Sequence, residues 1–422
     1  MTLQVAPKSR LHLFHAIGVE LEYMIVDCNT LDIRPITDEL LKGVSGSYVS
    51  EVERGDIAWS NELVLHVVEL KTNGPASIPS GFEPLPDIFQ KHVDDINRRL
   101  AAFDARLMPT AMHPWMNPWK EMHLWPHEYN PIYEAYNRIF DCRGHGWANL
   151  QSTHINLPFS GDEEFGRLHA AIRLVLPLLP ALAASSPIAD GALTGLADFR
   201  LEVYRNNAVR IPSITGLMIP ERVYTRADYD KVIFQRMYRD ITPFDPDKTL
   251  RDEWLNSRGA IARFDRNAIE IRLLDIQECP LADLAIVNLV VDTVKALVNG
   301  KWSTFENQKV QDEKDLYPIL VNGIENAEDT IIDNSSFLKL FGFDGDAVTA
   351  GGLWRQIASE LYDNFEQSES NLHRALKVIF NEGSLSTRIK RRLSSTPDKK
   401  DLKQTYGQLC DCLSKGIQFS AE

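Results

Sequence analysis

The stretch GVELEY at residues 18–23 decides the fold of this chain. Charged and apolar residues alternate in it with the two-residue period of a β-strand, so Glu20 and Glu22 project from one face of the strand. The stretch IEIR at residues 269–272 alternates in the same way and places Glu270 and Arg272 together. Strands that are apolar on one face and charged on the other indicate an antiparallel sheet covered by helices on one side only.

Two further segments add polar residues to this face. Residues 57–72 read as a strand that carries Glu62 and Glu69, and residues 151–158 read as a strand with His154 and Asn156 on one face. Glu62 and Glu69 are seven residues apart and would fall on opposite faces of an unbroken strand, so either a bulge is present or only one of them is a ligand. Glutamates aimed at a common space repel one another and need cations, and hard divalent ions prefer oxygen ligands. The pattern therefore predicts a magnesium–nucleotide site.

Each piece also has a structural explanation. Glu20 and Glu22 fit a solvated strand face, Glu270 with Arg272 fits a cross-strand ion pair, and His154 fits a core histidine that has its hydrogen-bond partners. The conjunction of inward glutamates, a histidine strand and a Glu-x-Arg strand favours the functional interpretation.

The rest of the chain reads as helices and loops around these strands. Residues 13–27 are expected to be a strand and residues 256–274 to contain one. Residues 88–105, a segment from Asp162, and residues 282–297 are expected to be helices. Residues 191–220 look like a loop, and the chain is helical from residue 311 on.

Residues 108–136 contain five prolines and many aromatic residues, which excludes a continuous helix or central strand there. We read this segment as a long loop, either a structural flap or a substrate lid with Trp115, Trp119 and Trp125 as an apolar wall.

Composition excludes several classes of protein. The formal net charge of −14 argues against a nucleic-acid surface, and the basic run at residues 388–392 reads as a solvated helix end or loop. Five scattered cysteines indicate reduced thiols in a cytoplasmic protein. No secretory signal is expected, because Lys8, Arg10 and His12 are not followed by an uninterrupted apolar run. The longest apolar run, residues 174–184, is broken by prolines and is shorter than the roughly 20 residues of a membrane span, so it reads as a buried helix. A Rossmann fold is not expected, because the chain lacks the G-x-G-x-x-G and Walker A patterns.

The motifs in order resemble one known family. They are GVELE at residues 18–22, ELKT at 69–72, HPW at 113–115, Ser186-Pro187 followed by Gly191, Thr194-Gly195 and Arg200, and EIR at 270–272 with Asp275. Together they resemble the glutamate–cysteine ligase type 2 family of carboxylate–amine ligases, from about residue 17 to about residue 297. The resemblance implies the curved antiparallel sheet of the glutamine synthetase and guanido kinase superfamily, in a catalytic domain at 1–305 with a helical C-terminal region at 306–422.

The resemblance also implies a reaction and a set of site residues. The γ-carboxylate of glutamate would take the γ-phosphoryl group of ATP, and an amine such as cysteine would then displace phosphate. Arg272, Arg200 and Glu270 would be catalytic, and Arg272, Arg200 and Asn156 would contact the nucleotide. Two or three Mg²⁺ ions would be held by Glu20, Glu22, Glu62, Glu69, His154 and Glu270.

Two departures from the family pattern leave the amine open. Several relatives have His-x-His where this chain has His154 and Asn156, and Ile132 rather than arginine precedes Tyr133. The alternatives are a phosphotransferase like the guanido kinases, or a nucleotide sensor without turnover. The expected partners are small molecules, without nucleic acid or membrane, and a homo-oligomer is left open.

Overall fold

A nine-stranded sheet lies at the centre of the computed structural model, which describes residues 11–78 and 81–421. Its strand order is β10-β11-β7-β1-β4-β3-β2, with β5 and β6 also paired to β1, and every pairing in it is antiparallel. The strands are β1 (Ala16–Asp27), β2 (Glu51–Arg54), β3 (Ile57–Asn61), β4 (Val67–Thr72), β5 (Ala76–Ser77), β6 (Ala105–Met108), β7 (Ser152–Pro158), β10 (Ala260–Arg263) and β11 (Ala268–Asp275). Short hairpins pair β8 (Ile188–Ala189) with β9 (Ala192–Leu193) and β12 (Ile331–Ile332) with β13 (Val348–Thr349).

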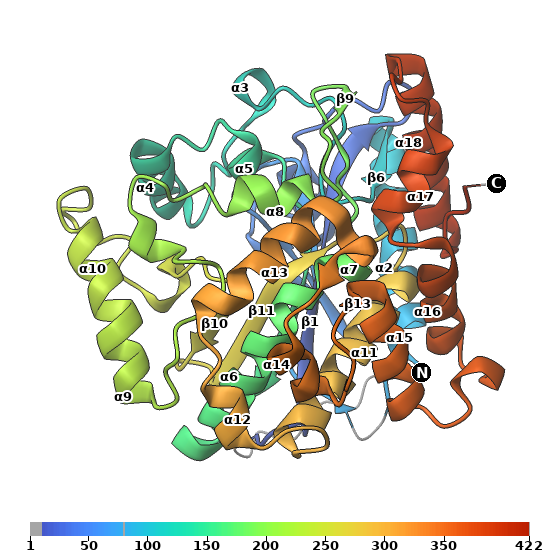
Figure 1. Ribbon diagram of the computed structural model, residues 1–422. Helices are drawn as coiled ribbons and strands as arrows, with labels where there is room; N and C mark the ends of the chain where they lie inside the picture. The colour runs from blue at the N-terminus through green and yellow to red at the C-terminus, as the bar shows by residue number, and fades with distance from the viewer. Residues whose placement is uncertain (1–10, 79–80, 422) are drawn as a thin grey trace.

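Helices surround this sheet (Figure 1). Those of the described residues are α1 (Thr37–Ser45), α2 (Leu85–Leu100), α3 (Pro118–Glu121), α4 (Asn130–Phe140), α5 (His145–Ala148), α6 (Gly161–Val175), α7 (Pro180–Ala183), α8 (Phe199–Tyr204), α9 (Arg226–Tyr229), α10 (Gln235–Ile241), α11 (Pro280–Val298), α12 (Phe305–Lys309), α13 (Glu313–Asn326), α14 (Ser335–Leu338), α15 (Ala350–Leu361), α16 (Asn371–Glu382), α17 (Leu385–Arg392) and α18 (Lys399–Lys415). Residues of α2, α6 and α11 pack on the apolar face of the sheet. In the described part of the chain, none of these helices is both long and apolar enough to cross a membrane.

The predicted apolar face of β1 is confirmed. Val19, Leu21 and Tyr23 are fully buried and belong to one apolar core with residues of α2, α6 and α11. Burying one apolar face at this period leaves the intervening glutamates on the opposite face, as the sequence predicts. Burial itself alternates less than predicted, because Glu22 is only 7% exposed, and Met24 and Val26 on its face are buried against residues of α17 and α18. The α+β fold with a large antiparallel sheet is confirmed.

The segments at residues 57–72 and 256–274 each contain two strands. β3 and β4 form a hairpin, as do β10 and β11. The connection between β3 and β4 is hydrogen-bonded to the aromatic segment: Trp125 N donates to Leu63 O and Leu65 N donates to His123 O. The turn between β3 and β4 was not expected, because it contains neither glycine nor proline and gives no local signal.

Two segments expected to be loops contain helices. Residues 108–136 carry α3 and the start of α4, and residues 191–220 carry α8. The helix expected at 88–105 ends at Leu100, because Asp104 adopts a left-handed backbone conformation and β6 begins at Ala105.

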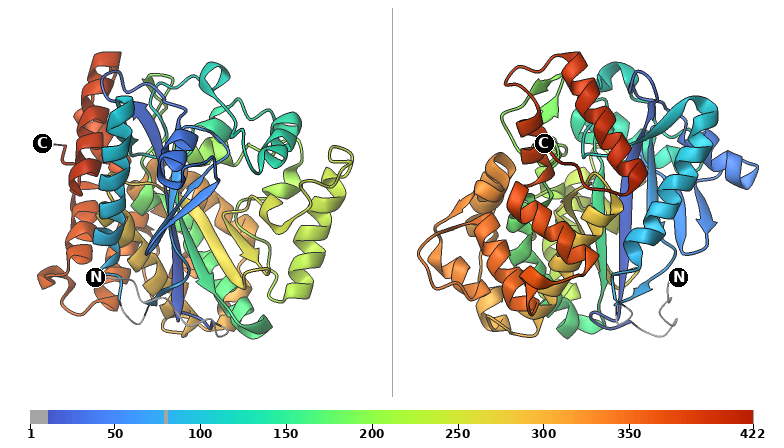
Figure 2. Two further views of the ribbon diagram at one scale, coloured as in Figure 1. Left: turned by 180° about the vertical axis from the view of Figure 1, so that it is seen from behind. Right: turned by 90° about the vertical axis from the view of Figure 1, so that its right-hand side faces the viewer.

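The C-terminal helices pack directly on the rest of the protein. The main core includes Leu316, Trp354 and Leu376 together with the strands of the sheet, so apolar packing is continuous across residue 305. α18 packs beside α2 (Figure 2). The boundary at 305 and 306 stays a prediction.

The basic run at residues 388–392 does end a helix, but it is not all solvated. Arg388 is fully buried, and its guanidinium pairs with Glu278 at 2.5 Å. A charge this deep requires such a partner.

Candidate functional site

Four strands present a grid of polar side chains on the face opposite α2, α6 and α11. In the register of the sheet, Glu20 of β1 lies between His154 of β7 and Lys71 of β4, and Glu22 lies opposite Glu69. Residues directly opposite in an antiparallel pair share a face, with their Cβ atoms about 4.5–5.5 Å apart. The sheet therefore gathers carboxylates that are far apart in sequence.

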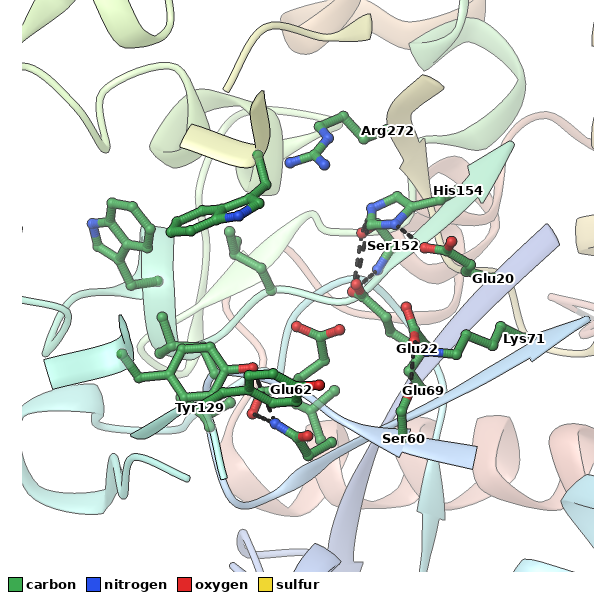
Figure 3. A pocket seen from close by; sticks show the side chains of 18 of the residues that line it. Glu20, Glu22, Ser60, Glu62, Glu69, Lys71, Tyr129, Ser152, His154 and Arg272 are labelled. Carbon is green, nitrogen blue, oxygen red and sulfur yellow. Dashed lines mark hydrogen bonds and ion pairs between the residues drawn. The ribbon is translucent and has the colours of Figure 1, made fainter. Parts of the chain in front are cut away.

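These side chains line a cavity of about 850 Å³ on the polar face (Figure 3). The predicted residues that line it are Glu20, Glu22, Glu62, Glu69, His154, Arg200, Glu270 and Arg272. Asn156 is set back from the lining, and its Nδ2 donates to Glu20 Oε1 at 3.0 Å. Asn156 thus orients Glu20 in this structure, and its predicted nucleotide contact stays a prediction.

His154 is the hub of the hydrogen bonds in the grid. Its Nδ1 lies 2.9 Å from Glu20 Oε2, and its Nε2 lies 2.9 Å from Ser152 Oγ. Ser152 also donates to Glu22 Oε2 from its backbone N at 2.7 Å and from its hydroxyl at 3.0 Å. Glu22 and Glu270 each bring a carboxylate oxygen within 3.9 Å of the imidazole. Four predicted residues from β1, β7 and β11 therefore converge on one face.

The charges in the grid shift one another's protonation. Burial opposes the charged form of His154, but Glu20, Glu22 and Glu270 outweigh it and raise its pKa to about 9. Burial alone would raise the pKa of Glu20, yet the hydrogen bond and charge of His154 lower that pKa to about 2. The surrounding carboxylates thus favour the imidazolium form of His154, and metal binding through its nitrogen requires loss of that proton.

The hairpin of β3 and β4 brings Glu62 and Glu69 together. Glu62 follows directly after β3, and Glu69 of β4 lies opposite Ser60, whose hydroxyl donates to Glu69 Oε2 at 2.5 Å. Burial and the neighbouring carboxylates raise the pKa of Glu69 to about 7 and raise that of Glu62 well above its ordinary value. Because a turn and not an unbroken strand connects Glu62 to β4, the two glutamates lie close together without a bulge.

Two overlapping groups in the described chain could hold metal ions. One is Glu20, Glu69 and His154, the other is Glu22, Glu62 and Glu69, and the ligand atoms in each lie within 4.8 Å of one another. Carboxylate oxygens with at most one imidazole are a donor set suited to Mg²⁺ or Mn²⁺. Burial is the main cause of the raised pKa values of Glu62 and Glu69, and the neighbouring carboxylates add a repulsion that a bound cation would offset.

The two predicted arginines, Arg200 and Arg272, line the same cavity as the glutamates. Arg272 pairs with Glu270, two residues before it on β11, while Arg200 at the start of α8 pairs with Asp275 at the end of β11. Arg200 Nη2 and Arg272 Nε are buried and have no hydrogen-bond partner among the described residues. Unpaired guanidinium N–H groups beside a cavity are suited to an anionic ligand.

Sequence reasoning assigned no role to several residues of the lining. Lys71 contacts Glu51 at 2.7 Å and Glu69 at 3.2 Å, and Arg263 and Arg266 reach the cavity from the β10–β11 hairpin. Lys71 had a signal, because it is two residues after Glu69 and so shares its face. The two arginines had none, since the turn that aims them was not recognised.

The aromatic segment contributes differently from the prediction. Trp115, Trp119 and Trp125 lie outside the cavity lining, which instead includes Tyr129 and Tyr133. Trp115 donates from Nε1 to Asp32 Oδ1 at 2.9 Å and packs against the C-terminal cluster that contains Tyr406. Trp119 is 65% exposed, and Trp125 is fully buried. The tryptophan wall was therefore wrong, because helical and turn geometry within the segment points these rings elsewhere.

Comparison with known proteins places this chain in a family of ligases. The sequence matches the family described as glutamate-cysteine ligase family 2 over residues 16–406, and the chain belongs to that family.

Individual relatives share part of the sequence, and a solved structure shares the fold. A protein of Archaeoglobus fulgidus without an assigned function is 36% identical over 281 residues, which are 66% of this chain and 74% of that protein. A candidate glutamate–cysteine ligase 2-3 of Rubrobacter xylanophilus is 28% identical over 194 residues, which are 45% of this chain and 48% of that protein. The match thus spans about half the length of the named relatives. The solved glutamate–cysteine ligase of Francisella tularensis, in complex with AMP, has the same fold, with a TM-score of 0.57 at 13% identity over 96% of this chain and 89% of that one.

Proposed function

We propose that this protein is an ATP- and Mg²⁺-dependent ligase that joins the γ-carboxylate of glutamate, or of a close analogue, to an amine through an acyl phosphate. The observation that carries the proposal is the meeting of Glu20, Glu22, Glu62, Glu69 and Glu270 with His154, Arg200 and Arg272 in one cavity. Family membership supports it, and cysteine is the amine suggested by the names of relatives.

The reaction consists of two displacements. A carboxylate oxygen of glutamate forms a bond to the γ-phosphorus of ATP while the bond from that phosphorus to ADP breaks. The amine nitrogen then bonds to the acyl carbon, the bond to phosphate breaks, and the nitrogen loses a proton. A free carboxylate would have to expel oxide, whereas phosphate leaves readily, so activation is what makes the amide accessible.

Phosphoryl transfer depends mainly on positioning and on neutralising charge. Arg200 and Arg272 would donate to phosphate oxygens, and Glu270 and Asp275 hold their guanidinium groups in place. The carboxylate groups with His154 would hold Mg²⁺, which when bound supplies positive charge at the phosphates.

The test is a coupled assay of phosphate and amide with ATP, glutamate and a panel of amines that includes cysteine. A ligase releases phosphate in step with amide and only when both substrates are present. Accumulation of a phosphorylated product would indicate a phosphotransferase instead, and nucleotide binding without either product would indicate a sensor.

The variant Glu270→Gln sharpens this assay. It keeps the shape of the side chain and removes a charge from the grid, so we expect kcat to fall by at least about a hundredfold while the protein stays folded. Normal ATP consumption by the folded variant would contradict the assignment of Glu270.

A further inference from the structure

Lys71 places a positive charge inside the acidic grid (Figure 3). Its ammonium lies 3.2 Å from Glu69 Oε2 and 2.7 Å from Glu51 Oε2, so it joins a carboxylate of β4 to one of β2. Its side chain is 29% exposed and lines the same cavity as the metal-binding candidates.

Small side chains on β3 give Lys71 room to reach that far. Ala58 lies opposite Lys71, and Ser60 lies between Glu69 of β4 and Glu51 of β2 in the register of the sheet. A larger residue at either β3 position would stand between the ammonium and Glu51. The lysine is therefore seated in a space bounded by Glu51, Ser60 and Glu69.

Lys71 occupies one side of a carboxylate that both candidate metal groups share. Ser60 Oγ and Lys71 Nζ both contact Glu69 Oε2, and Glu69 is the residue that the two metal groups have in common. The Lys71 nitrogen lies between the carboxylates of Glu69 and Glu51. A divalent ion could bind these two carboxylates if the ammonium were absent. An ammonium fixed there excludes such an ion by occupying the space and by repulsion.

We propose that the Lys71 ammonium takes the place of a third metal ion, so that the site binds two divalent ions, one at each of the groups that share Glu69. This rests on the proposed function, because it assumes that the grid binds metal. Lys71 is then a built-in cation that also holds Glu69 through Oε2 and leaves its other oxygen to the metal groups, in the way that residues around a metal orient its ligands.

The test counts bound Mn²⁺, as a probe for Mg²⁺, by the electron paramagnetic resonance signal of the free ion during titration of the full chain. We expect two ions per chain in the natural protein and in Lys71→Arg, which keeps the charge. Lys71→Met keeps the length of the side chain without its charge, and we expect it to bind three. Lys42→Met is the matched control: it removes an exposed lysine that also pairs with a glutamate, Glu39 at 3.5 Å, and should bind two.

A double variant separates a new site from a general change in charge. Lys71→Met with Glu51→Gln should return to two ions, because the added site needs the Glu51 carboxylate. Three ions in the natural protein, or an unchanged count in Lys71→Met with only tighter binding, would overturn the proposal. No bound ion in the folded natural protein would instead refute the metal site of the proposed function.

Discussion

Two arginine–glutamate pairs of this protein lie in opposite surroundings. Arg272 and Glu270 border the cavity, and the arginine side chain there is 19% exposed. Arg388 and Glu278 are fully buried, and both also contact the backbone of Phe419. The same residue types therefore border an open cavity in one place and form a buried ion pair in the other. The cavity differs from the interior pair in its open space and in its excess of carboxylates over basic groups.

The largest effect should follow from removing the carboxylate that both metal groups share. We expect Glu69→Gln to lower kcat by about a thousandfold or more, since two cations would each lose a ligand. Its stability should stay the same or rise, because burial and the charge of Glu20 already raise the pKa of this carboxyl group to about 7. Kinetics and urea unfolding measure the two quantities.

Glu53→Gln on the neighbouring strand β2 is the control for this substitution. Glu53 is exposed and does not line the cavity, so neither quantity should change. A stable Glu69→Gln variant with near-normal turnover would remove the contrast between the two regions.

The interior pair should behave in the opposite way. Arg388→Met leaves Glu278 buried without its charge partner, and we expect the free energy of unfolding to fall by about 3–5 kcal/mol. Activity per folded molecule should be retained, because this pair lies outside the cavity lining. Adding Glu278→Leu should recover much of the stability, and Arg391→Met, at an exposed arginine, should change it little. Loss of activity in folded Arg388→Met would show that the pair acts on the site.

The two regions also differ in how far the sequence could predict them. The two-residue alternation placed Glu20, Glu22 and Glu270 on one face, because the period of a strand is a local property. The turn after Asn61 was missed, since long-range contacts from Leu63 and Leu65 to the aromatic segment hold it. The burial of Arg388 was missed because its partner, Glu278, is 110 residues away in sequence. Pairing across such separations follows from tertiary packing, which local pattern does not encode.

Acid should destabilise the region around the C-terminal helices. His113 is buried as a neutral imidazole: Nδ1 accepts from Trp115 N at 3.2 Å, and Nε2 lies 2.7 Å from Leu31 O. Burial lowers its pKa from the ordinary 6.5 to about 4. Since the folded pKa is depressed, the unfolded state binds the proton first, and stability present above pH 6.5 is lost as the pH falls towards 4.

His113→Gln tests this pH dependence, because its amide can accept and donate like the neutral ring. Between pH 6.5 and 4 the natural protein should lose up to about 1.4 kcal/mol per pH unit more than the variant in urea unfolding. Parallel stability curves for the two proteins would exclude His113 as the cause.

The smallest effect concerns the aromatic segment, where one residue borders the cavity and another does not. Tyr129 lines the cavity and is 49% exposed. It is the N-cap residue of α4, and its backbone φ of 70° is a conformation that costs energy for a bulky residue. Trp115 donates a hydrogen bond to Asp32, and the ammonium of Lys399, at the start of α18, lies 5.3 Å from the centre of the indole ring. If the segment excludes water from an acyl phosphate, Tyr129 is the residue placed to do so.

Tyr129→Ala should therefore raise the ratio of phosphate released to amide formed by roughly two- to threefold, with little change in stability. Trp115→Ala should leave that ratio near one and instead lower the free energy of unfolding by about 3 kcal/mol, because it removes packed aromatic surface. The ratio is measured at saturating ATP with both variants in parallel. The reverse result, a changed ratio only in Trp115→Ala, would mean that water reaches the intermediate from the C-terminal side. Equal ratios in both variants would make the whole segment structural, and the contrast between its two ends would then be one of packing alone.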